Sequence, residues 1–105
     1  MIVGVARLSF VFFECHSLKE RRSLLLRIKN KTSNKFPVSI AEISDEAVAE
    51  HPFSKGGACQ RAVIGFASVG SETQHVNSII DNVIHFITGL YLGDIVDKRI
   101  EFINV

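Results

Sequence analysis

The sequence has few cysteines, which cross-link small secreted proteins through disulfides, and no apolar run long enough to cross a membrane. Its 105 residues include two cysteines, two prolines and no tryptophan. Two cysteines are too few for a disulfide framework, and charged residues or histidines interrupt every apolar run before the ~20 residues that span a bilayer. The first residues also lack the basic start and cleavage site of a signal peptide. We therefore expect a protein of the reducing cytoplasm with no membrane segment.

The composition favours one compact domain. Apolar residues make up 47% of the chain, charged residues 22%, and the net charge is +1. A chain of this length and apolar share is expected to bury about 60 to 70% of its unfolded surface in one core. The modest share of charged residues and the two prolines argue against disorder, and no low-complexity tract is visible. We therefore expect a single domain over residues 1–105.

Alternating apolar and polar residues predict four strands, at residues 2–13, 37–44, 60–70 and 93–105. A loop at residues 45–59 separates the second strand from the third and is long for a hairpin. The inward side chains of the first strand are expected to be Ala6, Leu8, Phe10 and Phe12. In the last strand, one face is expected to carry Val96, Ile100 and Phe102, and the other Asp97, Arg99 and Glu101.

Two helices are expected, each beginning at a serine-led capping box. In the first box, Ser17 accepts a hydrogen bond from an amide of the first turn, and Glu20 reaches back to the Ser17 amide. Ser71 has the same role in the second box. The first helix is expected to run to about Asn34, with an inward side made of Leu18, Leu25, Ile28 and Thr32. The second is expected to stop at Gly89, with an inward stripe of Val76, Ile79, Ile80, Val83 and Ile87.

The resulting order, βαβ followed by βαβ, is the split βαβ or ferredoxin-like pattern of the α+β class. It predicts a four-stranded antiparallel sheet with both helices on one face. Right-handed crossovers place the first and third strands in the middle of this sheet and leave the second and fourth at its edges.

Charge is distributed unevenly along the chain. Residues 19–35 hold seven basic residues and one acidic residue, a net charge of +6, so the remaining residues sum to −5. On the first helix these cations form a basic ridge that attracts phosphates over about 8 Å at physiological salt. Structured RNA, with ribosomal RNA as the expected example, is the predicted partner, and the predicted contacts are Lys19, Arg22, Arg27, Lys29, Lys31 and Lys35. A helix face that serves only solubility carries the same signature, and this alternative stays open.

Arg21 is the exception among these cations. It falls within the apolar arc of the helix, where its aliphatic stem is buried but its charge needs a partner. Glu42, on the second strand, is the nearest candidate. The pattern therefore favours a structural ion pair between Arg21 and Glu42 over a role in binding.

The open face of the sheet supports a different kind of partner. It is expected to carry Arg7, Ser9, Arg99 and Glu101 among apolar side chains, without the stacking aromatics of an RNA-recognition motif. A half-apolar face of this kind suits a second subunit. The alternative function is therefore a homodimeric module that binds a protein or a small ligand through the sheet and has no role with nucleic acid.

Little in the sequence indicates catalysis or a cofactor. The fold brings Cys15, His16, His51 and Cys59 to the same end of the sheet, where two thiols and two imidazoles would suit zinc. Their spacing has no CxxC or HxxxH element, so separate, ordinary side chains are the preferred interpretation. Cys15 beside His16 also lacks a third group that would orient the imidazole. We expect a protein that is not an enzyme and holds no metal or cofactor.

Several segments resemble the YlxP-like family of small bacterial proteins, domain of unknown function 503. The most specific is HSLKERR at residues 16–22; the others are MIVGV at 1–5 followed by Arg7 and Leu8, FPV at 36–38 leading into SIAEI at 39–43, QRA at 60–62, and the helix around His75 and Val76. The resemblance implies a ferredoxin-like fold. It also implies an association with translation, because genes of this family lie beside ribosome-maturation and initiation-factor genes.

The resemblance carries over no catalytic residue and no ligand. The sequence departs from the family pattern between Ile43 and Gln60, where relatives have a shorter acidic connection. Cys15 and Cys59 are not features of the family either. A metal or thiol site at these cysteines would therefore be peculiar to this chain.

Overall fold

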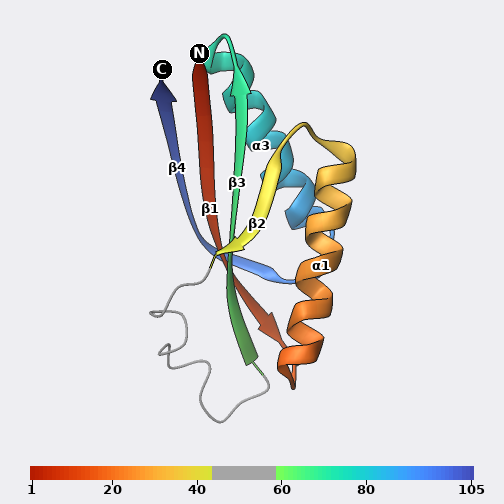
Figure 1. Cartoon of the computed structure of the whole chain (residues 1–105). Helices are drawn as coiled ribbons and strands as arrows, with labels where there is room; N and C mark the ends of the chain where they lie inside the picture. The colour runs from red at the N-terminus through yellow and green to blue at the C-terminus, as the bar shows by residue number, and fades with distance from the viewer. Residues whose placement is uncertain (44–58) are drawn as a thin grey trace.

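The computed structural model describes residues 1–43 and 59–105, which form one sheet and two helices (Figure 1). The elements are β1 (Ile2–Phe13), α1 (Leu18–Lys35), β2 (Ser39–Ile43), β3 (Cys59–Gly70), α3 (Thr73–Gly89) and β4 (Asp94–Asn104). The strand order is β2-β3-β1-β4, and every neighbouring pair is antiparallel. Both helices cover the same face of the sheet. The predicted ferredoxin-like arrangement is therefore confirmed, with element ends shifted by one or two residues.

The core lies between the sheet and the two helices. The even residues of β1 from Ala6 to Phe12 are buried, so the predicted inward face is confirmed. Of the odd residues, Arg7 and Phe13 are exposed, but Val11 is buried as well. Leu25 and Ile28 of α1 meet this face, and so does the α3 stripe of Val76, Ile80, Val83 and Ile87. Burying one such aliphatic or aromatic side chain contributes about 1.5–3 kcal/mol, so this layer supplies the main driving force for folding.

The start of α1 is capped as expected, with one difference. The Ser17 hydroxyl accepts a hydrogen bond from the Glu20 amide at 3.1 Å. The Glu20 carboxylate, however, accepts from the amide of His16 at 2.9 Å, not from that of Ser17. The box therefore closes one residue further back than predicted. It satisfies one orphan amide of the first turn, that of Glu20, and the amide of His16, which precedes the N-cap.

The prediction that Ser71 caps the second helix is wrong. The N-cap of α3 is Glu72, and its side chain makes no capping hydrogen bond. Packing accounts for the difference, because Val76 is fully buried and lies against Gly70, the last residue of β3. The buried position of Val76 fixes the rotation of the helix, so α3 begins one residue after the expected box.

Two apolar residues also lie differently from expectation. Leu18 is 54% exposed. It is the first residue of α1, and helical side chains tilt toward the N-terminus, so it leans past the end of the helix rather than onto the sheet. Val96 is 50% exposed because the β1–β4 register shifts between Ser9 and Phe10, which leaves Val96 as the extra residue of a bulge. Ile95 packs against the core in its place.

Candidate nucleic-acid interface

Helix α1 lies along one side of the helical layer, beside β2, with its outer surface turned away from the sheet (Figure 1). Leu25, Ile28 and Thr32 form its buried side. The predicted contact residues lie around the rest of the helix. Lys29 is half-buried, and the exposed ones are Lys19, Arg22, Arg27, Lys31 and Lys35. The sequence therefore folds so that a segment of net charge +6 has most of its cations in solvent.

These cations form two rows with Lys19 between them, rather than a single ridge. Arg27, Lys31 and Lys35 follow one another at intervals of four residues, which places them one above the other on the helix. Arg22 and Lys29 are seven residues apart and form the second row on the opposite flank. Because a helix with its side chains is about 10–12 Å across, the two rows are spaced to reach phosphates on separate stretches of backbone.

The rows keep their charge available. Within residues 1–43 and 59–105, Arg21 is the one α1 cation that forms an ion pair. Lys35 instead lies over two aromatic rings, with Nζ 4.8 Å from the ring centre of Phe86 and 5.9 Å from that of Phe36. These contacts stabilise the position of Lys35 without neutralising it. They also place the Arg27–Lys31–Lys35 row on the side of α1 that faces α3.

Arg21 has the structural role that its place on the helix predicts. Its Nη2 lies 3.3 Å from Oε1 of Glu42 on β2. Its Nη1 donates a hydrogen bond of 2.9 Å to the backbone carbonyl of Arg61 on β3. The predicted ion pair is therefore present, and the same guanidinium also holds α1 to the central strand β3.

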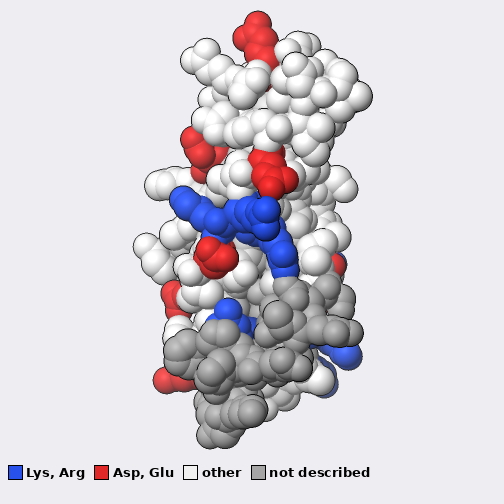
Figure 2. Space-filling model, turned by 90° about the vertical axis from the view of Figure 1, so that its left-hand side faces the viewer, with Lys and Arg blue, Asp and Glu red and all other residues white. Residues whose placement is uncertain are grey.

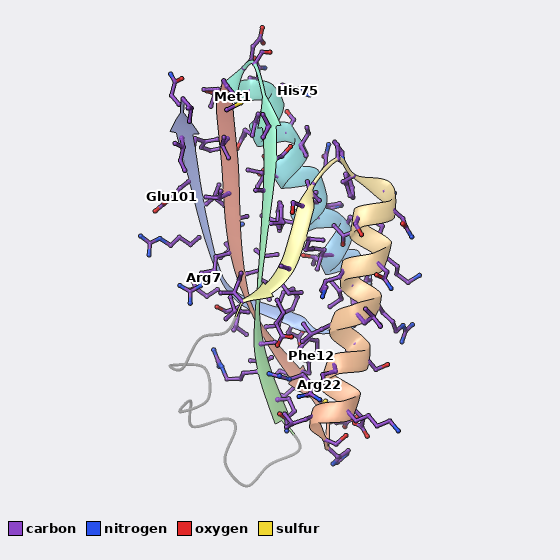
Figure 3. All side chains as sticks on the ribbon, viewed as in Figure 1. Met1, Arg7, Phe12, Arg22, His75 and Glu101 are labelled. Carbon is purple, nitrogen blue, oxygen red and sulfur yellow. The ribbon has the colours of Figure 1, made fainter. Side chains whose placement is uncertain are left out.

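A second candidate surface lies on the open face of the sheet, opposite the helices. A hollow of about 840 Å³ has its floor in small residues of β2 and β3, among them Ala41, Gly65 and Ala67. Arg7, Arg99 and Glu101 form its other side, and Arg99 pairs with Glu101 at 3.2 Å. Figure 2 shows a band of basic side chains across the middle of this face, flanked by acidic ones. In Figure 3, Arg7 and Glu101 project away from the helices, whereas Phe12 lies between the sheet and α1.

Residue alternation predicts Arg7, Arg99 and Glu101 on this face, but the hollow was not predicted. The available signal was the run of small residues at alternate positions in two neighbouring strands, Ser39 and Ala41 in β2 and Gly65 and Ala67 in β3. Side chains on one face of a sheet recur every second residue. Where small residues of two neighbouring strands lie side by side on that face, the surface has a depression.

The cysteine and histidine cluster receives no support from the part that the structure describes. Cys15 is buried, and its thiol lies 3.6 Å from the carbonyl of Ser17, while His16 is exposed. His51 and the side chain of Cys59 lie outside the described part. Among the side chains that are described, no three of the metal-binding types gather at one place. His85 of α3 is exposed and lies on the side of the helix away from its buried stripe.

None of the helices in the described residues has the length and apolar character needed to cross a bilayer.

Comparisons with known proteins found similar structures, a similar protein and a matching family. Among solved structures, two designed proteins are similar to this chain: "De novo designed protein Foldit4" has a TM-score of 0.49 at 9% identity, covering 100% of this chain and 99% of that one. "De novo designed protein Ferredog-Diesel" has a TM-score of 0.37 at 16% identity, covering 92% and 83%. The "Uncharacterized protein YlxP" of Bacillus subtilis (strain 168) is 31% identical over 86 residues, which cover 82% of this chain and 83% of that protein. The model of the family "Protein of unknown function (DUF503)" matches residues 3–100. The chain therefore belongs to the DUF503 family.

Proposed function

We propose that this protein is a non-enzymatic accessory protein that contacts the backbone of structured RNA through the exposed side of α1. The observation that carries the proposal is the gathering of six cations on one helix, unpaired within the described residues, in a chain whose net charge is only +1. Each phosphate that a lysine or arginine neutralises releases condensed counterions, and this release favours binding.

The chemistry of the rows favours contacts to phosphate rather than to bases. Long lysine and arginine side chains on a helix surface reach phosphate oxygens, and such contacts position a protein without reading sequence. Two rows separated by the width of the helix also suit the backbone of a folded RNA, whose strands approach one another closely. We therefore expect binding that tolerates changes of sequence but requires a folded RNA.

Ribosomal RNA is the proposed target within this class. The family resemblance implies an association with translation, and the ribosome is the main source of structured RNA in that process. The first experiment is sedimentation of the protein with purified ribosomal particles and, separately, with an isolated folded fragment of ribosomal RNA. Binding to both supports direct contact with RNA, whereas binding to particles alone assigns the contact to ribosomal protein.

A matched pair of variants tests whether α1 is the binding surface. Lys31→Glu and Lys98→Glu change the net charge by the same amount, but Lys31 lies on α1 and Lys98 on β4. We expect Lys31→Glu to weaken binding to the RNA fragment by about tenfold, and Lys98→Glu to change it by less than about threefold. Equal losses in the two variants would mean that the overall charge acts, not the helix, and would contradict the proposal.

The hollow on the open face supports a second candidate function, binding of a small anionic molecule. Its small floor residues admit a flat group, and the guanidinium groups of Arg7 and Arg99 lie at its side. Under this interpretation, Arg99→Gln abolishes binding of the ligand, and RNA leaves the sedimentation of the protein unchanged. Sedimentation with and without RNA separates the two functions, because a sheet-binding module ignores the nucleic acid.

A further inference from the structure

We propose that a second copy of this chain pairs with the outer edge of β4, so that two sheets join into one of eight strands. The surface involved is the edge of β4 between Val96 and Asn104. It differs from the open face of the sheet and from α1, and the inference does not rest on the proposed contact with RNA.

The backbone of β4 leaves a regular set of hydrogen-bonding groups along this edge. Met1 and Val105 exchange two hydrogen bonds, from the Val105 amide to the Met1 carbonyl at 2.8 Å and from the Met1 amino group to the Val105 carbonyl at 2.9 Å. Bonded and non-bonded pairs alternate along an antiparallel ladder. Because the register is regular from Ile2–Asn104 to Ser9–Asp97, the amides and carbonyls of Lys98, Ile100, Phe102 and Asn104 point away from β1.

Beyond the bulge at Val96, the edge is long and regular enough to pair with another strand. β4 is eleven residues long and contains no proline, whereas β2 at the other edge has five residues. Apolar side chains are exposed along it, among them Phe102 at 39% and Ile103 at 47%. A long edge strand with exposed apolar residues is a ready template for another strand, and proteins normally blunt such edges unless they use them.

Charge complementarity selects the second copy as the partner and fixes the register. A two-fold axis through Ile100 places Arg99 of each copy opposite Glu101 of the other, on the open face. These are non-hydrogen-bonded pairs, whose Cα atoms approach to about 4.5 Å. Opposite charges at such positions stabilise strand pairing. Within one chain the two side chains already pair at 3.2 Å but stay 72% and 55% exposed, so pairing across copies is available to both.

Other registers fit less well. An axis through Arg99 keeps the outward amides paired, but it places Arg99 opposite Arg99 and Asp97 opposite Glu101, so like charges face each other. An axis through Lys98 draws the bulged segment at Val96 into the paired region. An axis through Phe102 places Glu101 opposite Ile103. The register centred on Ile100 therefore combines a regular backbone with two complementary ion pairs.

The helical layer leaves room for this arrangement. α3 packs mainly on β1 and β3 and contacts β4 little, so the face of β4 that carries Phe102 is only partly covered. In the proposed register, Lys98 of the second copy lies opposite Phe102, and its aliphatic stem covers the exposed ring. Both α1 helices remain at the outer sides of the joined sheet, away from the interface.

Sedimentation velocity from roughly 1 to 500 µM tests the proposal, and we expect the mass to rise to twice that of the monomer. Arg99→Glu and Glu101→Arg each place like charges across the axis, and each is expected to weaken the dimer by about tenfold or more. The double swap, Arg99→Glu with Glu101→Arg, restores the pairs and is expected to restore the dimer. Arg27→Glu, on α1, is the control and leaves the dimer intact even if it abolishes binding to RNA.

Lys98→Pro provides a second test that does not depend on charge. It removes one outward amide, and the internal ladder loses no bond because that amide points away from β1. We expect this variant to unfold as cooperatively as the wild type but to remain a monomer. Hydrogen exchange of the wild type at high concentration should protect the amides of Lys98, Ile100 and Phe102. A monomer at all concentrations, or a dimer unaffected by Lys98→Pro and by the charge reversals, would overturn the proposal.

Discussion

Arg21 and Glu42 form an ion pair at 3.3 Å that joins α1 to β2, and the same guanidinium donates a hydrogen bond to the carbonyl of Arg61 in β3. One side chain thus holds the helix to two strands of the sheet. The Arg21 side chain is 20% exposed and that of Glu42 is 37% exposed, so the contact is shielded from solvent mainly on the arginine side.

Removing the arginine is therefore expected to lower the free energy of unfolding more than removing the carboxylate does. Arg21→Ala loses the ion pair, the hydrogen bond and the packing of its stem, and we expect the free energy of unfolding to fall by about 1–3 kcal/mol. Glu42→Gln keeps the hydrogen bond from Arg21 to Arg61 and the packing of the Arg21 stem. We therefore expect the free energy of unfolding to fall by at most about 1 kcal/mol. Urea unfolding followed by circular dichroism measures both values. Arg22→Ala, an exposed neighbour, is the control and stays within about 0.5 kcal/mol. A larger loss for Glu42→Gln than for Arg21→Ala would contradict this account.

The two helix starts differ in capping and predict different mutational effects. Ser17→Ala removes the hydroxyl that accepts from the Glu20 amide, so we expect a loss of about 1 kcal/mol. Ser71 does not cap α3, and Ser71→Ala is expected to change stability by less than about 0.5 kcal/mol. Replacing Glu72, the actual N-cap, with Asp should stabilise α3 by about 0.5–1 kcal/mol, because a shorter carboxylate reaches the orphan amides. Thermal unfolding of the three variants checks this; equal costs for the two serine variants would show that the cap assignment is wrong.

These two serines show how far the fold was predictable from the sequence. Alternation of apolar residues predicted the strands, their order and the buried face of β1, because one-sided burial leaves a period of two in the sequence. The Ser17 box was predictable because it is local. The Ser71 box resembled it, but the packing of Val76 against Gly70 decided where α3 begins. The bulge at Val96 left no local signal, because it depends on the pairing with β1.

Gly4 of β1 lies directly under two side chains of α3. A Cβ at this position would come within 2.5 Å of Ile80 Cδ1 and of Val76 Cγ1. Both neighbours are buried and have little room to move, so we expect Gly4→Ala to lower stability by about 1–3 kcal/mol. Gly89, where a Cβ would meet nothing within 4 Å, provides the matched control. Gly89→Ala is expected to be neutral or stabilising in the same denaturant titration, and similar effects of the two substitutions would refute the close approach of α3.

Tyr91, just after α3, has a left-handed backbone with φ of 54° and a side chain that is 89% exposed. A non-glycine residue in this region costs about 1–2 kcal/mol, and the ring gains little from packing. We expect Tyr91→Gly to raise stability by up to about 1 kcal/mol, less the entropy that glycine adds to the unfolded chain. Tyr91→Ala keeps the strain and is expected to bring no gain. Differential scanning calorimetry distinguishes these outcomes, and equal melting temperatures for the Gly and Ala variants would argue against strain at this residue.

The sequence predicts the basic side of α1 better than it predicts the hollow on the open face. The basic side of α1 follows from residue types and helical period alone, and the structure places its cations largely in solvent. Its division into two rows, and the position of Lys35 over Phe86, needed the packing of α1 against α3. The hollow on the open face depends on small residues of two strands meeting in register, which only the pairing of β2 with β3 reveals.

The most direct test of the account is the salt dependence of binding to a folded fragment of ribosomal RNA. With four to six phosphate contacts from α1, we expect the affinity of the wild type to fall by about 10²–10³ between roughly 50 and 200 mM salt. In Arg27→Glu/Lys31→Glu, the slope of log affinity against log salt is expected to decrease by about two. An affinity that does not change with salt, or a double variant that binds as tightly as the wild type, would contradict the proposal that α1 contacts RNA.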